Sequence, residues 1–158
     1  YILFFLQPHY RNFGKRLTKS PKLYFYDTGL VSWLLGIQSP EQITIHAQRG
    51  ALFETWVVAE LMKGRFNRGL ASNLYFWRDS TGNEVDVLAE QGERLLPIEI
   101  KAGRTLASDA FAGLNKWCEL AGEVSGPVHL CYAGDEGRQR GGVSVQPWRE
   151  VANLADTL

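Results

Sequence analysis

The sequence has few cysteines and histidines, and their spacing excludes the common disulfide and zinc sites. Cys118 and Cys131 lie far apart in apolar surroundings and form no CxxC pair, so neither a disulfide-stapled scaffold nor a structural zinc site is indicated. Free thiols in apolar surroundings are typical of core residues in a reducing compartment, so we expect a cytoplasmic protein. His9, His46 and His129 stand alone, and the apolar neighbours of His129 indicate a packed core histidine.

The sequence also lacks net charge and long apolar runs. Its 17 basic and 17 acidic residues give a formal net charge of zero, so no overall field draws the chain to nucleic acid or membrane. The apolar stretch at residues 1–6 is too short to span a bilayer. No GxxxxGK[ST] phosphate loop occurs, which excludes ATP binding by that motif within this chain. Any affinity for a charged partner must come from a local cluster of side chains.

The composition that is present is typical of one globular α/β domain. The chain has 158 residues, of which 45% are apolar and 12% aromatic, enough to bury one core. An apolar, proline-free segment predicts a buried helix from Arg49 to about Arg65, with Gly64 near its end. Alternating and aromatic runs then predict a meander of three strands at 73–79, 84–90 and 94–102.

The rest of the chain extends this pattern. We predict a helix at 107–123, strands at 127–135 and 142–148 with a polar loop between them, and a short terminal helix. Upstream, residues 22–27 predict a strand, 28–36 a helix and 37–45 a loop. Pro97 cannot donate to a strand ladder, so it is a candidate for a bulge. The element order predicts an α/β fold whose mixed central sheet is flanked by helices.

The predicted hairpin at 84–101 carries acids and a lysine where a core would need apolar residues. Alternation places Glu84 and Asp86 on one face of their strand, opposite Val85 and Val87. It places Glu99 and Lys101 on one face of the next strand. A turn around residues 92–93 pairs residue i with residue 185 minus i, which sets Asp86 opposite Glu99.

Two opposed carboxylates repel each other unless a cation lies between them. We therefore expect Asp86 and Glu99 to ligate Mg²⁺ (or Mn²⁺), with the Ile100 carbonyl as a further ligand. Lys101 would then position the attacking water or stabilise phosphate charge, a chemistry suited to phosphodiester hydrolysis. A solvated sheet face with scattered charges is the alternative, and the spacing alone does not decide between them.

The predicted helix from Arg49 carries a carboxylate that needs a partner. On a helical wheel, Glu54 falls among Ala51, Val57 and Leu61, and an unpaired charge in such surroundings is costly. An ordinary salt bridge, for instance to an arginine, would satisfy it. A metal ion or a lysine cluster would satisfy it equally well, and the position makes Glu54 a candidate fourth metal ligand.

The segments "EVD" and "PIEIKAG" together resemble the PD-(D/E)xK, or restriction-endonuclease-like, nuclease motif. The resemblance implies a restriction-endonuclease-like core in which Asp86, Glu99 and Lys101 are catalytic and Glu54 matches the acid on the preceding helix. Val85 stands where the family name has proline. DNA is the partner that this family implies, with Arg78 as a candidate phosphate contact and Glu84 as a supporting acid.

Four segments within residues 16–103 also resemble the C-terminal domain, of unknown function, of a group of predicted bacterial and archaeal AAA-type ATPases. They are "RLTKSPKLYFYDTGL", "RGALFETWVVAEL", "LYFWRDSTGNEVDVLAE" and "PIEIKAG". This resemblance implies that residues 1–20 are the tail of a connection to a preceding ATPase and winged-helix region. Residues 21–158 would then form the restriction-endonuclease-like domain.

Two other functions stay open. A non-cleaving module of the same fold would bind DNA or a protein and regulate the attached ATPase, and the zero net charge favours it. The five basic residues among residues 1–26 would be either a phosphate-tracking stretch or a solvated connector. An oligomerisation domain is the third reading, suggested by five tryptophans in one small domain: Trp33, Trp56, Trp77, Trp117 and Trp148.

Overall fold

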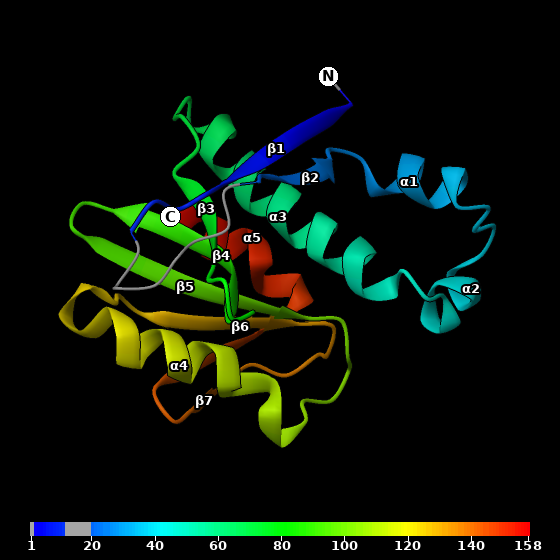
Figure 1. Cartoon of the computed structure of the whole chain (residues 1–158). Helices are drawn as coiled ribbons and strands as arrows, with labels where there is room; N and C mark the ends of the chain where they lie inside the picture. Colours follow the sequence, from blue (N-terminus) through cyan, green and yellow to red (C-terminus); the bar gives the residue numbers. More distant parts are fainter. Residues whose placement is uncertain (1, 12–19) are drawn as a thin grey trace.

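The computed structural model describes residues 2–11 and 20–158, and the strands of that part form one eight-stranded sheet (Figure 1). The strands are β1 (Leu3–Pro8), β2 (Lys22–Phe25), β3 (Leu74–Arg78), β4 (Glu84–Gln91), β5 (Arg94–Lys101), β6 (Val128–Tyr132), β7 (Arg138–Arg140) and β8 (Val143–Pro147). Their order across the sheet is β2-β1-β3-β4-β5-β6-β8-β7. The β1/β3, β5/β6 and β6/β8 pairs are parallel and the other pairs antiparallel, so the predicted mixed sheet is confirmed.

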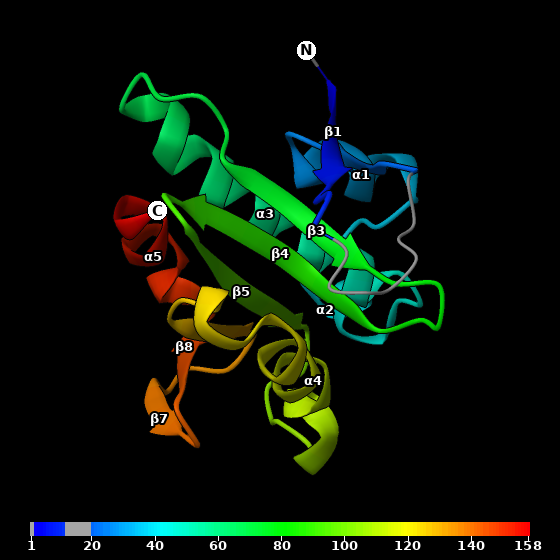
Figure 2. The ribbon, with the colours of Figure 1, turned by 60° about the vertical axis from the view of Figure 1, so that its left-hand side comes forward.

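Helices lie on both faces of the sheet, as predicted (Figures 1 and 2). They are α1 (Thr28–Leu34), α2 (Pro40–Ile45), α3 (Arg49–Asn67), α4 (Ala112–Ala121) and α5 (Val151–Thr157), with short 3₁₀ turns at Ser108–Phe111, Gly122–Val124 and Trp148–Glu150. Helices α3 and α5 cover one face, and α4 covers the other. We refer to these as the α3 face and the α4 face.

The core on the α3 face depends on a close crossing of α3 and α5. A Cβ at Gly64 would lie 2.5 Å from the Cβ of Ala155, so only glycine fits where the two helices meet. The predicted start of the helix at Arg49 is confirmed, and Gly64 lies near its end as predicted. Helix α3 continues to Asn67, and Gly64 serves packing rather than termination.

Two predicted loops contain regular structure. In residues 37–45, Pro40 takes the first position of α2, where its missing N–H costs no hydrogen bond. In the polar loop at 136–141, β7 pairs with β8 through a turn at Gly141 and Gly142, whose φ angles are 56° and 80°. A pair of glycines between two strands is a hairpin signal, because both positions need positive φ.

The start of the described chain belongs to the sheet. Strand β1 lies between β2 and β3 and pairs with both, although residues 1–20 were expected to form a connection. The boundary at residue 20 stays a prediction. Three of the five basic residues in the proposed phosphate-tracking stretch, Lys15, Arg16 and Lys19, lie outside the described residues. In the described ranges, no helix is long and apolar enough to cross a membrane.

Most of the tryptophans pack against other residues inside the domain. Trp77 and Trp117 are buried and meet edge to face with ring centroids 5.2 Å apart, and Trp56 and Trp148 meet in the same way at 5.9 Å. Trp33 on α1 differs, with 74% of its surface exposed. Four of the five tryptophans therefore have a structural explanation within one copy of the chain.

Candidate functional site

The register of the β4–β5 hairpin is the predicted one. Val87 pairs with Ile98 and Leu88 with Pro97, which is residue i opposite residue 185 minus i. Pro97 is paired regularly, so the suggested bulge at this proline is wrong. The regular ladder stops at Val87 and Ile98, one residue before Asp86 and Glu99, so the predicted pairing of these two acids is not part of it.

A bulge does occur, on the other side of β4. Tyr75 of β3 pairs with Leu88 and Trp77 with Val85, so Phe76 alone opposes both Asp86 and Val87. Such a bulge breaks alternation and re-aims a side chain. Val85 accordingly packs in the core on the α4 face, whereas Val87 packs in the core on the α3 face. The prediction that these two valines share one face is wrong for this reason.

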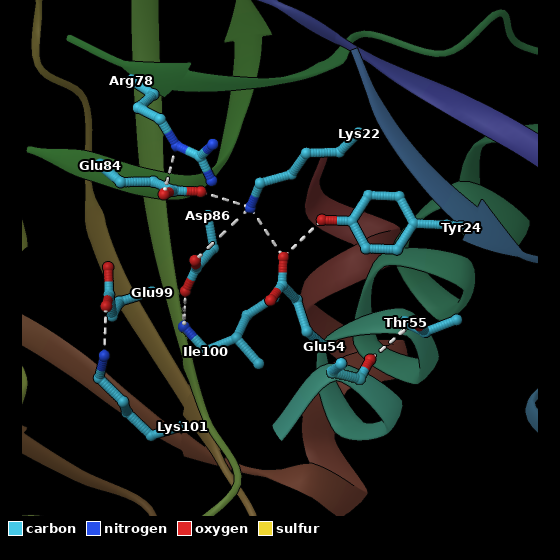
Figure 3. Close-up of polar contacts among 11 residues, drawn as sticks. Lys22, Tyr24, Glu54, Thr55, Arg78, Glu84, Asp86, Glu99, Ile100 and Lys101 are labelled. Atoms are coloured by element: carbon cyan, nitrogen blue, oxygen red, sulfur yellow. Dashed lines mark hydrogen bonds and ion pairs between the residues drawn. The ribbon is translucent and has the colours of Figure 1, made fainter. Parts of the chain in front are cut away.

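The bulge brings Asp86 to the α3 face, where four charged side chains meet (Figure 3). We call this group, Lys22, Glu54, Glu84 and Asp86, the α3-face cluster. The Lys22 Nζ lies 2.5 Å from Glu84 Oε1, 2.8 Å from Glu54 Oε1 and 3.9 Å from Asp86 Oδ1. Three carboxylates from α3 and β4 therefore surround one ammonium supplied by β2.

Neighbouring groups fix the carboxylates of this cluster. The Tyr24 hydroxyl donates to Glu54 Oε1 at 2.5 Å, and the Ile100 N–H donates to Asp86 Oδ2 at 2.8 Å. Ile100 was predicted to act through its carbonyl, but the contact that the structure shows is made by its N–H. Arg78 donates from Nε to Glu84 Oε2 at 2.6 Å, so the predicted phosphate contact is engaged by a carboxylate.

The charges perturb one another in opposite directions. Burial, together with the nearby charges of Glu99 and Glu54, raises the pKa of Asp86 well above its usual range. Burial alone would lower the pKa of Lys22, but its carboxylate partners outweigh that effect and raise it. Burial raises and the bonds from Arg78 and Lys22 lower the pKa of Glu84, with a net lowering. Lys22 is therefore firmly charged, and Asp86 is the member least suited to carry its charge unaided.

Glu99 and Lys101 form a separate group, which we call the α4-face pair. Lys101 Nζ lies 2.5 Å from Glu99 Oε1, which confirms that the two side chains share a face. The other oxygen, Glu99 Oε2, is buried and has no hydrogen-bond partner among the described residues. A Cβ at Gly113 of α4 would lie 3.5 Å from it, which places this oxygen under α4. Burial raises the pKa of Glu99 despite the lysine.

The structure therefore brings Glu54 and Asp86 together and leaves Glu99 and Lys101 on the other side of the hairpin (Figure 3). Two different clefts open onto the two groups. One is lined by the four members of the α3-face cluster together with Tyr24, Arg78 and neighbouring residues. The other is formed by the segment from Lys101 to Ala110 and includes Asp109.

The predicted metal ligands fit a divalent ion only in part. Glu54 and Asp86 supply carboxylate oxygens, which hard cations prefer, around a position that the Lys22 ammonium already takes. Glu99 does not face that position. Within residues 2–11 and 20–158, no group of three or more His, Cys, Asp or Glu side chains is placed to hold a metal ion. The pair of Glu54 and Asp86 is thus the part of the predicted set that suits Mg²⁺.

Sequence reasoning missed Lys22 and Tyr24 as members of the site. Both lie on β2 and point the same way, two residues apart, toward Glu54 on α3. A lysine and a tyrosine two residues apart lie on the same face of the predicted strand, and this pattern could have indicated a pair of partners for a buried acid. No local pattern, however, indicates that this strand lies at the edge of the sheet and packs against α3.

The sequence can be placed among known proteins. Residues 49–151 match the family described as domain of unknown function DUF4143. The chain belongs to this family. The match includes all of α3 and the β3–β5 meander, hence Glu54, Glu84, Asp86, Glu99 and Lys101. Residues 1–41, which include Lys22 and Tyr24, match a second family, domain of unknown function DUF8612.

Curated relatives of this DUF4143 domain occur in mycobacteria. The uncharacterized proteins Mb2031c of Mycobacterium bovis and Rv2008c of Mycobacterium tuberculosis are each 38% identical to the chain over 101 residues. That stretch is 63% of this chain and 22% of each relative. The chain therefore matches less than a quarter of the length of these relatives.

Proposed function

We propose that this domain is a metal-dependent nuclease with a restriction-endonuclease-like core, which hydrolyses phosphodiester bonds in DNA. The observation that carries the proposal is the meeting of Glu54 and Asp86 on one cation position beside the end of the β4–β5 ladder. Carboxylates from a helix and a strand, converging under an open cleft, could supply two of the oxygen ligands of Mg²⁺, which usually keeps several waters. The Glu-x-Lys sequence on β5 lies beside it, across the hairpin.

The residues have distinct proposed roles. Glu54 and Asp86 would hold Mg²⁺ (or Mn²⁺), and the Ile100 N–H keeps the Asp86 carboxylate aimed at the α3 face. When bound, the ion would supply an activated water and neutralise charge on the phosphate. Glu99 and Lys101 remain proposed catalytic residues, and the Ile100 carbonyl a proposed ligand. The buried Oε2 of Glu99, which has no hydrogen-bond partner among the described residues, is a further carboxylate oxygen close to the hairpin.

Two cations beside the α3-face cluster are the proposed contacts for a DNA phosphate. Lys22 and Arg78 line the cleft together with the carboxylates of the cluster, so a phosphate would meet these cations once a metal ion offsets the carboxylates. Arg78 is half exposed at the rim and is free to exchange a carboxylate for a phosphate.

We further propose that the domain works in the cytoplasm as the C-terminal part of a longer protein, after an AAA-type ATPase and a connecting region. The relatives are consistent with a longer protein, because the matched stretch is 22% of their length. In that arrangement residues 1–20 would lead from the ATPase, and the ATPase would be the covalent partner of residues 21–158.

The nuclease proposal is tested by nicking of supercoiled plasmid DNA with Mn²⁺ or Mg²⁺. We expect nicking by the wild-type chain, and a loss of about 100-fold or more in Asp86→Asn and in Lys101→Met. Glu119→Gln is the matched control, because Glu119 is an exposed acid of α4 paired with Lys116 alone among the described contacts. Circular dichroism and thermal unfolding of each variant show whether the fold persists.

A non-cleaving module is the second candidate, and one observation favours it. A lysine contacts the carboxylates on each face of the hairpin, and Arg78 adds a second cation on the α3 face, so the carboxylates have cationic partners without any metal ion. The same plasmid experiment separates the two functions. DNA retained in a gel shift with no metal-dependent nicking would replace the nuclease proposal with a binding module that regulates the ATPase.

A further inference from the structure

Lys22 is the basic residue of the α3-face cluster, and it takes no part in the metal coordination proposed above. Its ammonium lies within 4 Å of carboxylate oxygens from Glu54, Glu84 and Asp86, and 5.4 Å above the ring of Phe76. Its side chain is only 16% exposed. The ammonium thus occupies the centre of the carboxylate group rather than its rim.

Other lysines of the described chain make simpler contacts. Lys63 and Lys116 each pair with one glutamate on their own helix and are about half exposed, and Lys101 pairs with Glu99. Surface pairs of this kind contribute little. An ammonium shared by three carboxylates from two other elements does what a bound cation does, because it offsets repulsion that would otherwise separate them.

Lys22 also comes from a part of the sheet that leaves its ammonium room to withdraw. It lies on β2, a four-residue edge strand whose sheet neighbour is β1. A lysine side chain has a flexible four-carbon stem, so the ammonium can leave the cluster without breaking the strand ladder. The cleft over the cluster gives it solvent to enter.

We propose that the Lys22 ammonium is a tethered cation that holds the Glu54 and Asp86 position and competes with a divalent metal ion for it. The inference rests on the proposed function. A metal ion between Glu54 and Asp86 would use the oxygens that Lys22 now contacts, and two cations cannot share them without strong repulsion. Metal binding therefore requires Lys22 to leave. The apparent affinity for metal equals the intrinsic affinity multiplied by the fraction of chains in which Lys22 has left.

The test measures binding of MnCl₂ alone, without DNA, by isothermal titration calorimetry and by thermal shift. Lys22→Met removes the ammonium and keeps the length of the side chain. We expect this variant to bind Mn²⁺ about tenfold more tightly than the wild-type chain and to gain more thermal stability from it. Lys22→Arg keeps a cation in place, so its affinity should stay at or below the wild-type value.

Lys116→Met is the control, since it makes the same chemical change at an exposed lysine of α4 and should leave Mn²⁺ affinity unchanged. Equal Mn²⁺ affinity in the wild-type and Lys22→Met chains, with loss of binding in Asp86→Asn, would overturn the competition and leave the nuclease proposal standing. Weaker binding in Lys22→Met would also overturn it, because Lys22 would then assist the metal. Absence of binding in every variant would overturn both proposals.

Discussion

The two faces of the β4–β5 hairpin solve the same electrostatic problem in different ways. On the α4 face, Glu99 has one lysine two residues away on the same strand, and one of its oxygens remains buried without a partner. On the α3 face, Lys22 arrives from a strand more than thirty residues before α3's Glu54 and serves three carboxylates at once. The α4-face pair is therefore local in sequence, and the α3-face cluster is tertiary.

The α4-face pair and the α3-face cluster therefore depend on the rest of the fold to different degrees. A pair on one strand forms wherever the strand forms, so it needs little from the rest of the fold. A cluster assembled from β2, α3 and β4 exists only when the whole sheet is built, and it links the sheet edge to the helix layer. We expect loss of the lysine to destabilise the fold more in the α3-face cluster than in the α4-face pair.

The largest expected effect comes from removing each lysine in turn without metal present. Lys22→Met leaves three carboxylates without their shared partner and should lower the free energy of unfolding by about 3 kcal/mol. Lys101→Met removes a partner whose side chain is 39% exposed, and should cost under about 1 kcal/mol. Urea denaturation of both variants measures the difference. Equal losses of unfolding free energy would show that the α3-face cluster and the α4-face pair contribute equally to stability, contrary to this account.

Asp79 is a buried carboxylate whose charge is stabilised by hydrogen bonds rather than by a lysine. Asp79 is buried in the turn between β3 and β4, where its oxygens accept bonds from the N–H and side-chain groups of Thr81 and Asn83. Burial alone would raise the pKa of Asp79, but these bonds outweigh it and hold the pKa at about 2, below the usual 3.8.

Asp79→Ala should lower the free energy of unfolding by about 2 kcal/mol at neutral pH. The folded chain binds the Asp79 proton less tightly than the unfolded chain does. This contribution is therefore present above about pH 4 and is lost as the pH falls toward 2. Unfolding curves at several pH values should show the wild-type and variant stabilities converging in acid. A gap that stayed constant down to pH 2 would contradict this account.

The smallest expected effect concerns Tyr24, the neutral member of the surroundings of Glu54. Tyr24→Phe removes one hydrogen bond to Glu54 Oε1 and leaves Lys22 in place, so we expect a loss of about 1 kcal/mol. Tyr10→Phe, at a tyrosine that is 76% exposed, is the control and should have no measurable effect on thermal unfolding. A loss as large as that of Lys22→Met would mean that the hydroxyl, not the ammonium, holds Glu54.

Much of the fold followed from local patterns in the sequence. The α3 helix, the three-stranded meander and the strands β6 and β8 after α4 were predicted because their apolar patterns are strong. Helix α2 and strand β7 were missed for local reasons. Pro40 was taken as a loop signal rather than a helix start, and the hairpin glycines at 141–142 were passed over. The position of β1 inside the sheet was missed because it depends on a long-range pairing.

The acidic residues of the candidate site were singled out from the sequence, but its arrangement and its two members from β2, Lys22 and Tyr24, were not. Register arithmetic correctly placed Val87 opposite Ile98, and the partner that Glu54 needed does exist. The bulge opposite Phe76 has no sequence signal of its own, since neither glycine nor proline marks it. Without it, simple alternation assigns Asp86 to the face of Glu99. The sequence therefore indicated which residues carry charge but not on which side of the sheet each one lies.

The extra residue in β4 has a consequence for comparing members of this family. The side to which the Asp86 carboxylate points depends on two residues, rather than one, lying between Val85 and Leu88 opposite Phe76. Loss or gain of a single position in that stretch would move the acid from one layer to the other while every motif letter stayed intact. Length polymorphism there is thus a more sensitive marker of altered chemistry than substitution.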